Sequence, residues 1–209
     1  MSLRPTPAFW DARYGATEDF VFGTEPNEFL KASAENIPAN GPVLCLCEGE
    51  GRNACFLAGR GHSVTAIDSS AAGLEKAARL ASSRGVNITT QVADLSEYSI
   101  KPGSYAGIIS IFAHLPPALR RRVHADVVAG LQPGGVLILE AYTPDQIALG
   151  TGGPKDPAMT MTLAGLREEL QGLNLEVGQE LRRDVREGTG HTGVGAVVQV
   201  IARRPMAAN

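Results

Sequence analysis

The sequence is 209 residues long and has no apolar run long enough to cross a bilayer. Its start, MSLRPTPAFWDARYG, also lacks the apolar stretch of a secretory signal peptide. We therefore predict a cytoplasmic protein without a membrane partner.

Positive charge is not in excess, since the formal net charge is −3. A protein that binds a phosphate backbone usually carries a basic footprint, so no nucleic-acid partner is expected. The three cysteines are an odd number without paired metal spacing, and we predict neither a metal site nor a redox role. Cys45 and Cys47 alternate along an apparent strand, which predicts that they share one face as small apolar side chains.

Apolar residues make up 44% of the chain and charged residues 20%, which is typical of a folded globular domain. Short apolar runs that alternate with helical patterns predict strands and helices in turn. The strands are expected at 43–47, 63–67, 88–92, 105–111 and 136–142. The helices are expected at 24–37, 52–60, 70–83, 116–130 and 162–171.

Continuous apolar strands are typical of a parallel sheet that is covered on both faces. Two further β-like runs, at 173–185 and 191–203, flank the turn sequence REGTG and predict a hairpin at the sheet edge. The expected fold is α/β, a doubly wound, seven-stranded, mostly parallel Rossmann-like sheet whose C-terminal strand is antiparallel. We predict one domain over 1–209, with an N-terminal lid segment at 1–41 and a core at 42–205.

The most informative stretch is VLCLCEGEGRNACFLAGRGHSVTAID, residues 43–68. A strand runs into Gly49-Glu50-Gly51, and a helix follows. Gly49 permits the tight turn, and Gly51 is expected to let the backbone approach a ligand at the helix N-terminus. Asp68 ends the second strand, where a carboxylate can accept hydrogen bonds from ribose hydroxyls.

The same turn also satisfies the dinucleotide fingerprint Gly49-x-Gly51-x-x-Ala54, so an NAD(P)-dependent oxidoreductase is an alternative. Glu48 and Glu50 argue against it, because carboxylates at the strand tip would repel a pyrophosphate. S-adenosylmethionine (SAM) has no phosphate and carries a cationic ammonium and sulfonium. The acidic tip therefore favours SAM.

Asp94 and Leu95 follow the third strand, where they can bind the amino group and the face of an adenine. The run LQPGGVLILE, at 131–140, is expected to end a helix with a Pro-Gly-Gly turn into the fifth strand. We predict that SAM is bound by Glu48, Gly49, Glu50, Gly51, Asn53, Asp68, Ser69, Asp94, Leu95 and Ile111.

The runs EGEGRNA, ADL at 93–95 and LQPGGVLILE, with Asp68 at its strand end, resemble the motifs of class I SAM-dependent methyltransferases. FWDARYG and FVFGTEPNEFL near the start, GTGGPKDP in the middle and EGTGHTGVGAVVQVIAR near the end resemble the tellurite-resistance (TehB-like) group, near the thiopurine methyltransferases. This resemblance implies that Trp10, Arg13 and Tyr14 belong to a lid over SAM, with Tyr14 near the methyl group. For Trp10, a purely hydrophobic anchor is the alternative.

The chain departs from that group in the C-terminal hairpin, where Arg182 stands at the histidine position of the group's His-Arg pair. The sequence EGTGH also replaces a later arginine. These departures weigh against tellurite specificity but leave the methyl donor unaffected.

Catalytic or acceptor-contacting residues are predicted at His114, His191, Tyr14 and Arg186, which topology brings to the same sheet edge. His114 could instead be satisfied by backbone at a helix start, and His191 could be a cross-strand partner of Glu187. Soft anions such as thiolates or chalcogen oxyanions need little base.

The predicted function is SAM-dependent methyl transfer to a small molecule, with a chalcogen oxyanion or a thiol as the expected acceptor. Two alternatives are an NAD(P)-dependent oxidoreductase and a SAM-binding sensor without turnover. No feature of the sequence sets an oligomeric state.

Overall fold

The computed structural model describes residues 5–207 and contains one seven-stranded sheet in the order β3-β2-β1-β4-β5-β7-β6. The strands are β1 (Pro42–Leu46), β2 (Ser63–Asp68), β3 (Thr89–Val92), β4 (Tyr105–Ile111), β5 (Leu131–Tyr142), β6 (Asn174–Glu187) and β7 (His191–Arg203). The first five strands are parallel, whereas β7 is antiparallel to both β5 and β6. The predicted doubly wound, mostly parallel sheet with an antiparallel C-terminal strand is confirmed.

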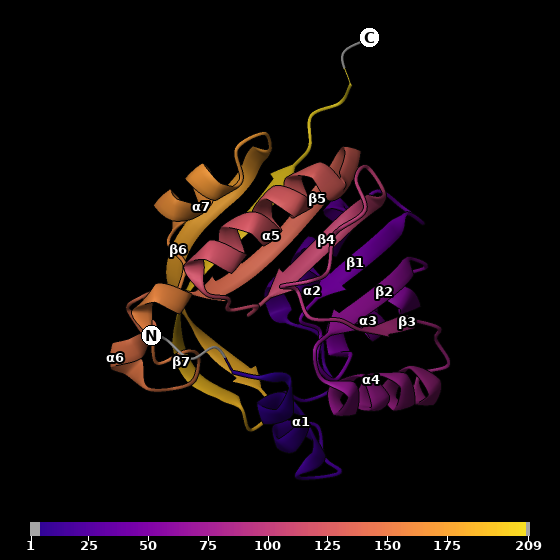
Figure 1. The fold of residues 1–209 in the computed structure, drawn as a ribbon, viewed down its shortest axis with the longest axis vertical. Coiled ribbons are helices and arrows are strands. Elements are labelled where there is room, and N and C mark those ends of the chain that lie inside the picture. Colours follow the sequence, from indigo (N-terminus) through magenta and orange to yellow (C-terminus); the bar gives the residue numbers. More distant parts are fainter. Residues whose placement is uncertain (1–4, 208–209) are drawn as a thin grey trace.

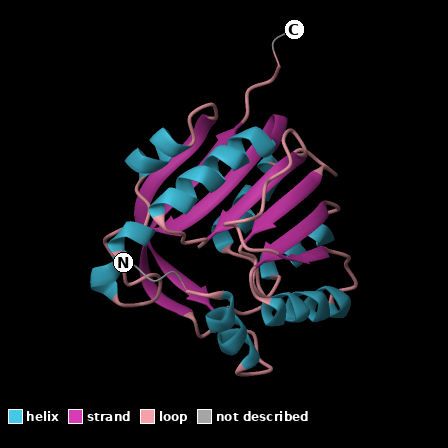
Figure 2. Cartoon of the chain, in the orientation of Figure 1, coloured by secondary structure: helices cyan, strands magenta, loops and turns pink. Residues whose placement is uncertain are grey.

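Helices cover both faces of this sheet, as Figures 1 and 2 show. One face packs against α5 (Pro117–Gly130) and α7 (Leu163–Glu169), which contribute Val127 and Leu166 to the larger apolar cluster. The other face packs against α2 (Glu28–Ser33), α3 (Arg52–Gly59) and α4 (Ala71–Ser83). Residues of β1 and β5 alternate between the two apolar clusters, as period-2 side-chain alternation requires.

The N-terminal region differs from its prediction. A helix not expected from the sequence, α1 (Pro7–Gly15), begins after Thr6, whose hydroxyl accepts a hydrogen bond from the Phe9 N–H. The helix expected over 24–37 is shorter, because Asn27 caps α2 and the chain continues as a 3₁₀ turn, η1 (Ala34–Asn36). Pro26 precedes that cap and removes one backbone donor from the expected helix.

Two further local expectations were wrong. The Pro-Gly-Gly sequence after α5 is not a separate turn, because β5 begins at Leu131 and includes Gly134 and Gly135 with a register shift against β4. Cys47 does not share a face with Cys45, since β1 ends at Leu46 and Cys47 has a positive φ of 50°. Cys45 packs in one apolar cluster and Cys47 against the other.

The C-terminal hairpin of β6 and β7 extends beyond the sheet and reaches α1 (Figure 1). Its turn lies at 188–190, as REGTG predicted, and Gly190 donates a hydrogen bond to the Val21 carbonyl. Within residues 5–207, none of the helices has the length and apolarity needed to span a membrane. The remaining helical turns are α6 (Gln146–Leu149) and η2 (Pro157–Met159).

Candidate active site

A cavity of about 620 Å³ lies at the carboxyl ends of β1, β2 and β4. Three segments distant in sequence cover it: the N-terminal region through Phe22, the loop 152–156 and the hairpin turn with His191. Eleven residues predicted for the site line this cavity: Arg13, Tyr14, Glu48, Glu50, Asn53, Asp68, Ser69, Leu95, Ile111, His114 and His191. Gly49, Gly51, Asp94 and Arg186 are predicted site residues that do not line it.

Glycine is required at both positions of the turn because neighbouring protein atoms leave no room for a side chain. Gly49 and Gly51 have φ values of 60° and 88°, which an L side chain rarely adopts. A Cβ on Gly51 would lie 2.5 Å from the Ala77 Cβ and 2.7 Å from the Ala77 Cα on α4. A Cβ on Gly49 would lie 2.6 Å from the Tyr14 hydroxyl. The close approach of α4 therefore requires glycine at position 51, and the predicted approach of a ligand to its backbone stays a prediction.

Glu48 is buried and caps α3, although it lies before the first glycine rather than at the cap position. One of its carboxylate oxygens accepts hydrogen bonds from the N–H groups of Asn53 at 2.9 Å and Ala54 at 2.8 Å. Burial raises the pKa of Glu48 to about 7 against the opposing effect of these two bonds. The first N–H groups of α3 are thus occupied by a carboxyl group of the chain itself.

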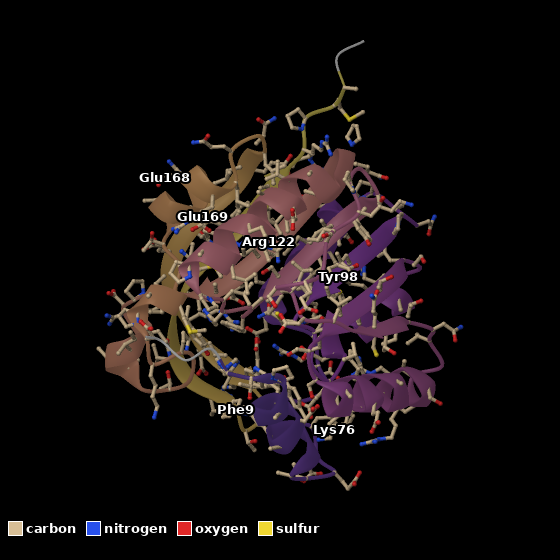
Figure 3. The ribbon with its side chains drawn as sticks, in the orientation of Figure 1. Phe9, Lys76, Tyr98, Arg122, Glu168 and Glu169 are labelled. Atoms are coloured by element: carbon tan, nitrogen blue, oxygen red, sulfur yellow. The ribbon has the colours of Figure 1, made fainter. Side chains whose placement is uncertain are left out.

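Glu50 faces the N-terminal segment. Its two carboxylate oxygens accept hydrogen bonds from the N–H groups of Val21 and Phe22, each at 3.2 Å, and one of them pairs with the Lys76 ammonium at 3.0 Å. The side chains of Glu50 and Lys76 are 3% and 4% exposed. The ammonium also donates to the Asp19 carbonyl. Figure 3 shows Lys76 on α4, and Glu50 joins this helix to the segment that covers the cavity.

Asp68 is placed as the sequence predicted, at the end of β2 and against the glycine turn. It accepts hydrogen bonds from the N–H groups of Gly49 at 2.9 Å and Ser70 at 2.8 Å. Burial raises its pKa. Asp94 differs, because it accepts from the Ser96 N–H and hydroxyl within its own loop, whereas its neighbour Leu95 lines the cavity.

Aromatic residues and one arginine of the N-terminal region form part of the cover. The Trp10 and Tyr14 rings stack with centroids 5.6 Å apart, and Tyr14 is buried. The Arg13 guanidinium lies over the rings of Trp10 and Phe22 at 5.8 and 5.3 Å. Its Nε is buried and has no hydrogen-bond partner within the described part of the chain. Arg13 is therefore a cation that lines the cavity with donor capacity left over.

His114 is satisfied by backbone. Its Nε2 accepts a hydrogen bond from the Tyr142 N–H at 3.4 Å, so the Nδ1, 2.9 Å from the Met159 carbonyl, carries the proton and donates. Burial lowers its pKa to about 4. With both ring nitrogens engaged, His114 offers the cavity only its ring.

His191 is held differently. Its ring centroid lies 4.6 Å from that of Phe22, 4.9 Å from that of Phe112 and 5.4 Å from that of Tyr142. Its Nδ1 is 3.7 Å from a carboxylate oxygen of Glu187, the residue directly opposite across the hairpin. The cross-strand pairing considered for His191 is present, and His191 also lines the cavity.

Arg186 is not brought to the cavity. Its side chain is 81% exposed and pairs with Asp184 at 2.7 Å. Alternation along β6 explains the difference, because neighbouring Glu187 is buried and points to the opposite side.

The sequence reasoning missed a buried polar network behind the cavity. Glu187 contacts Arg52 at 2.5 Å and Arg183 at 3.2 Å, and Asn27 donates hydrogen bonds to both Glu187 and Glu140. These residues come from three elements, α3, β5 and β6, and from the loop before α2. Local spacing could not have found the network, because Asn27 meets Glu140 and Arg52 meets Glu187 over more than a hundred residues of sequence.

Comparison with known proteins relates these features to a family. Residues 43–135 match a family model described as a methyltransferase domain. A curated relative, 2-heptyl-1-hydroxyquinolin-4(1H)-one methyltransferase of Mycobacteroides abscessus, is 32% identical over 138 residues, which are 62% of this chain and 60% of the relative. The chain thus spans about 60% of that relative's length.

Two solved structures share the fold. One comes from work on the conversion of a disulfide bond into a thioacetal group during echinomycin biosynthesis. Its TM-score is 0.78, and it is 21% identical over 99% of this chain and 94% of its own length. TehB from Haemophilus influenzae has a TM-score of 0.68 and 19% identity over 95% of this chain and 66% of its own. At these identities the likeness shows the fold alone. The comparisons support the predicted methyltransferase class, and the tellurite-resistance subgroup stays a prediction.

Proposed function

We propose that this chain is a SAM-dependent methyltransferase that acts on a small molecule. The match of residues 43–135 to a methyltransferase domain supports the reaction class. The curated relative, which carries a methyltransferase name, supports a small-molecule acceptor. The cavity lies where open α/β sheets bind their ligands, outside the carboxyl ends of the strands.

The observation that carries the proposal is the position of the Glu48 carboxylate. A dinucleotide places its pyrophosphate on the first N–H groups of the helix after the glycine turn. Here the N–H groups of Asn53 and Ala54 already donate to Glu48. This occupancy, more directly than the charge repulsion argued from the sequence, disfavours the NAD(P) alternative.

The residues of the cavity fit SAM, which supplies an electrophilic methyl group on a cationic sulfur when bound. Asp68 accepts backbone hydrogen bonds from Gly49, Ser69 and Ser70, and its two carboxylate oxygens together retain acceptor capacity for a ribose hydroxyl. Arg13 retains hydrogen-bond donor capacity for the carboxylate in the amino-acid part of SAM. Leu95 and Ile111 provide apolar surface for a base.

The acceptor side favours a planar aromatic compound. The rings of Phe112 and His114 form an aromatic wall of the cavity, and the buried Tyr142 ring stacks on both at interplanar angles of 27° and 10°. Aromatic rings pack well against such a wall, and the relative is named for a hydroxyquinolinone. A chalcogen oxyanion or a small thiol, the acceptors expected from the sequence, would use less of this wall and are the second choice.

Isothermal titration calorimetry with SAM, S-adenosylhomocysteine and NADH tests the donor. We expect both sulfur compounds to bind and NADH to give no heat. Asp68→Asn is expected to weaken SAM binding about 10- to 100-fold, because a charged hydrogen-bond acceptor is lost. Asp126→Asn, which removes a surface carboxylate paired with Arg122, is the control and should leave binding unchanged. Binding of NADH alone would overturn the proposal.

Transfer of a labelled methyl group tests the reaction. The panel contains planar hydroxy- and thio-heteroaromatics, alkyl thiols, selenite and tellurite. We expect label in the heteroaromatic products. Donor binding without transfer to any acceptor would favour a SAM-binding sensor and contradict the enzyme proposal.

A further inference from the structure

The last residue pair of the C-terminal hairpin joins a carboxylate to an imidazole at the cavity. Glu187 ends β6, His191 begins β7, and the two are direct partners in the register of the hairpin. A Glu187 carboxylate oxygen lies 3.7 Å from the His191 Nδ1. The side chains are 4% and 12% exposed, so water screens this pair little.

Glu187 is fixed as an anion by its other contacts. Arg52 lies 2.5 Å from one oxygen, and Asn27 and Arg183 lie 2.8 and 3.2 Å from the other. Burial alone would raise the pKa of Glu187, but its contacts with His191, Arg52 and Asn27 lower the pKa to about 2. The carboxylate therefore presents a permanent negative charge to the imidazole.

His191 is oriented by its surroundings. Its Nδ1 is buried and has no hydrogen-bond partner among the described residues, and the Glu187 carboxylate oxygen lies 3.7 Å from it. Because Nδ1 is the buried nitrogen and His191 lines the cavity, we assign Nε2 to the cavity side. Burial lowers the pKa of His191, and Arg52 and Arg13 act in the same direction against the opposing Glu187. The nearby His114 is itself locked as the neutral Nδ1–H form.

We propose that His191 is the general base of this enzyme, that Glu187 is its positioning residue, and that the acceptor is consequently a hydroxyl that is protonated at neutral pH. This inference rests on the proposed function and narrows its substrate class. A thiolate or a chalcogen oxyanion needs no proton acceptor, whereas an aromatic hydroxyl does.

The proton balance is simple. The hydroxyl oxygen forms a bond to the methyl carbon as the carbon–sulfur bond of the donor breaks, and the sulfur leaves as a neutral thioether. The hydroxyl proton passes to Nε2 of His191. The imidazolium that results is stabilised by Glu187 through Nδ1–H and later releases the proton to solvent. Phe22, Phe112 and Tyr142 pack around the ring and limit the access of water to it.

The turnover test uses two acceptors of one shape, 2-naphthol and 2-naphthalenethiol, at about pH 8, where the thiol is ionised and the naphthol is not. His191→Gln is expected to lower kcat for the naphthol about 100-fold and kcat for the thiol less than about threefold. Val194→Ala, an exposed change on the same strand, is the control and should alter neither. Equal losses on both acceptors, or no loss on the naphthol, would overturn the base.

A second measurement does not depend on turnover. Nitrogen NMR of histidine-labelled protein, with His191 assigned through the His191→Gln spectrum, reports which ring nitrogen carries the proton. We expect the neutral Nδ1–H form at about pH 7. The Nε2–H form would overturn the proposal. If wild type bound SAM and transferred the methyl group to neither naphthalene compound nor any acceptor of the panel while showing the Nδ1–H form, the proposed function would fail and the orientation of the pair would stand.

The positioning role of Glu187 has its own readout. Glu187→Gln should lower the apparent pKa of the basic group in the pH profile of kcat/KM for naphthol, because the imidazolium loses its anion. The variant also removes a partner of Arg52, so its folding is checked by urea denaturation. An unshifted pH profile in a folded Glu187→Gln variant would show that Glu187 is only structural.

Discussion

The two halves of the cavity are built in different ways. The strand-tip half, residues 47–53, 68–69 and 93–95, comes from short turns that directly follow parallel strands. The roof, residues 9–22, 152–156 and 188–191, comes from three segments that meet only in the folded chain. Backbone hydrogen bonds to Glu48 and Asp68 fix the first half, whereas side-chain ion pairs and ring stacking hold the second.

This difference shows which half of the cavity can be predicted from local sequence alone. A turn after a strand has few possible geometries, so its glycines and acids identify it. A roof assembled from distant segments needs buried charges to fix its register, and a buried pair such as Glu50–Lys76 is costly to break once formed. The following changes test the comparison in order of expected effect.

Lys76→Met addresses the attachment of the roof. It removes the buried cation beside Glu50 and is expected to lower the free energy of unfolding by about 4 kcal/mol, because an uncompensated carboxylate stays buried. Urea denaturation measures this. Arg79→Met is the matched control on the same helix, since Arg79 contacts Glu18 of the N-terminal region at 3.5 Å in an exposed pair. We expect a change below about 0.5 kcal/mol there. Similar losses in both variants would contradict the distinction.

Gly51→Ala addresses the strand-tip half. The added Cβ meets the Ala77 backbone in addition to the strain of a positive φ, so the free energy of unfolding should fall by about 3 kcal/mol. Gly85→Ala carries a φ of 65° with nothing within 4 Å of the added Cβ and should cost about 1 kcal/mol. A Gly51→Ala variant no less stable than Gly85→Ala would show that α4 moves aside.

His114→Gln tests the pH dependence of folding. The folded-state pKa of about 4 lies below the unfolded value of 6.5, so the unfolded chain binds more protons between these limits. The free energy of unfolding should therefore fall as the pH is lowered from 6.5 to 4, by about 2 kcal/mol from this group. The variant should lack this loss.

Glu48→Gln is expected to change the pH dependence of the free energy of unfolding in the opposite direction to His114→Gln. Because the pKa of Glu48 is raised from 4.5 to about 7, the native state binds more protons in this window and wild type gains stability from Glu48 on acidification. Removing Glu48 should therefore steepen the acid loss, whereas removing His114 should flatten it. Changes of the same sign in the two variants would contradict the assignments. Both profiles come from urea denaturation at a series of pH values.

Arg186→Ala has the smallest expected effect. It directly compares the catalytic role predicted from the sequence with the exposed position that the structure shows. The structure places this side chain in solvent beside Asp184, so kcat should change less than about twofold and stability by less than about 0.5 kcal/mol. A large loss of methyl transfer would favour the catalytic role that the sequence suggested.

Prediction from the sequence succeeded where pattern and local geometry coincide. All seven predicted strands are present, although β5 begins at Leu131 rather than at 136, and Asp68 contacts the glycine turn. It failed where a neighbour distant in sequence determines the outcome. Gly51 packs against Ala77, and Glu50 pairs with Lys76 and the backbone of Val21 while it lines the cavity, contacts that the sequence did not predict. Helix α1 was missed because its amphipathic pattern is weak and its contacts are with α4.

The order of strands and turns, and with it the acidic, glycine-rich edge, follows from the amino-acid sequence because strand periodicity and turn chemistry act over a few residues. The roles of the two cavity histidines follow only from the tertiary structure. Both have the same side chain, yet His114 meets two backbone groups and His191 meets Glu187. The hydrogen-bonding or ionic partner of each imidazole comes from a segment that is distant in sequence. That partner determines which ring nitrogen carries the proton and whether the histidine can act as a base.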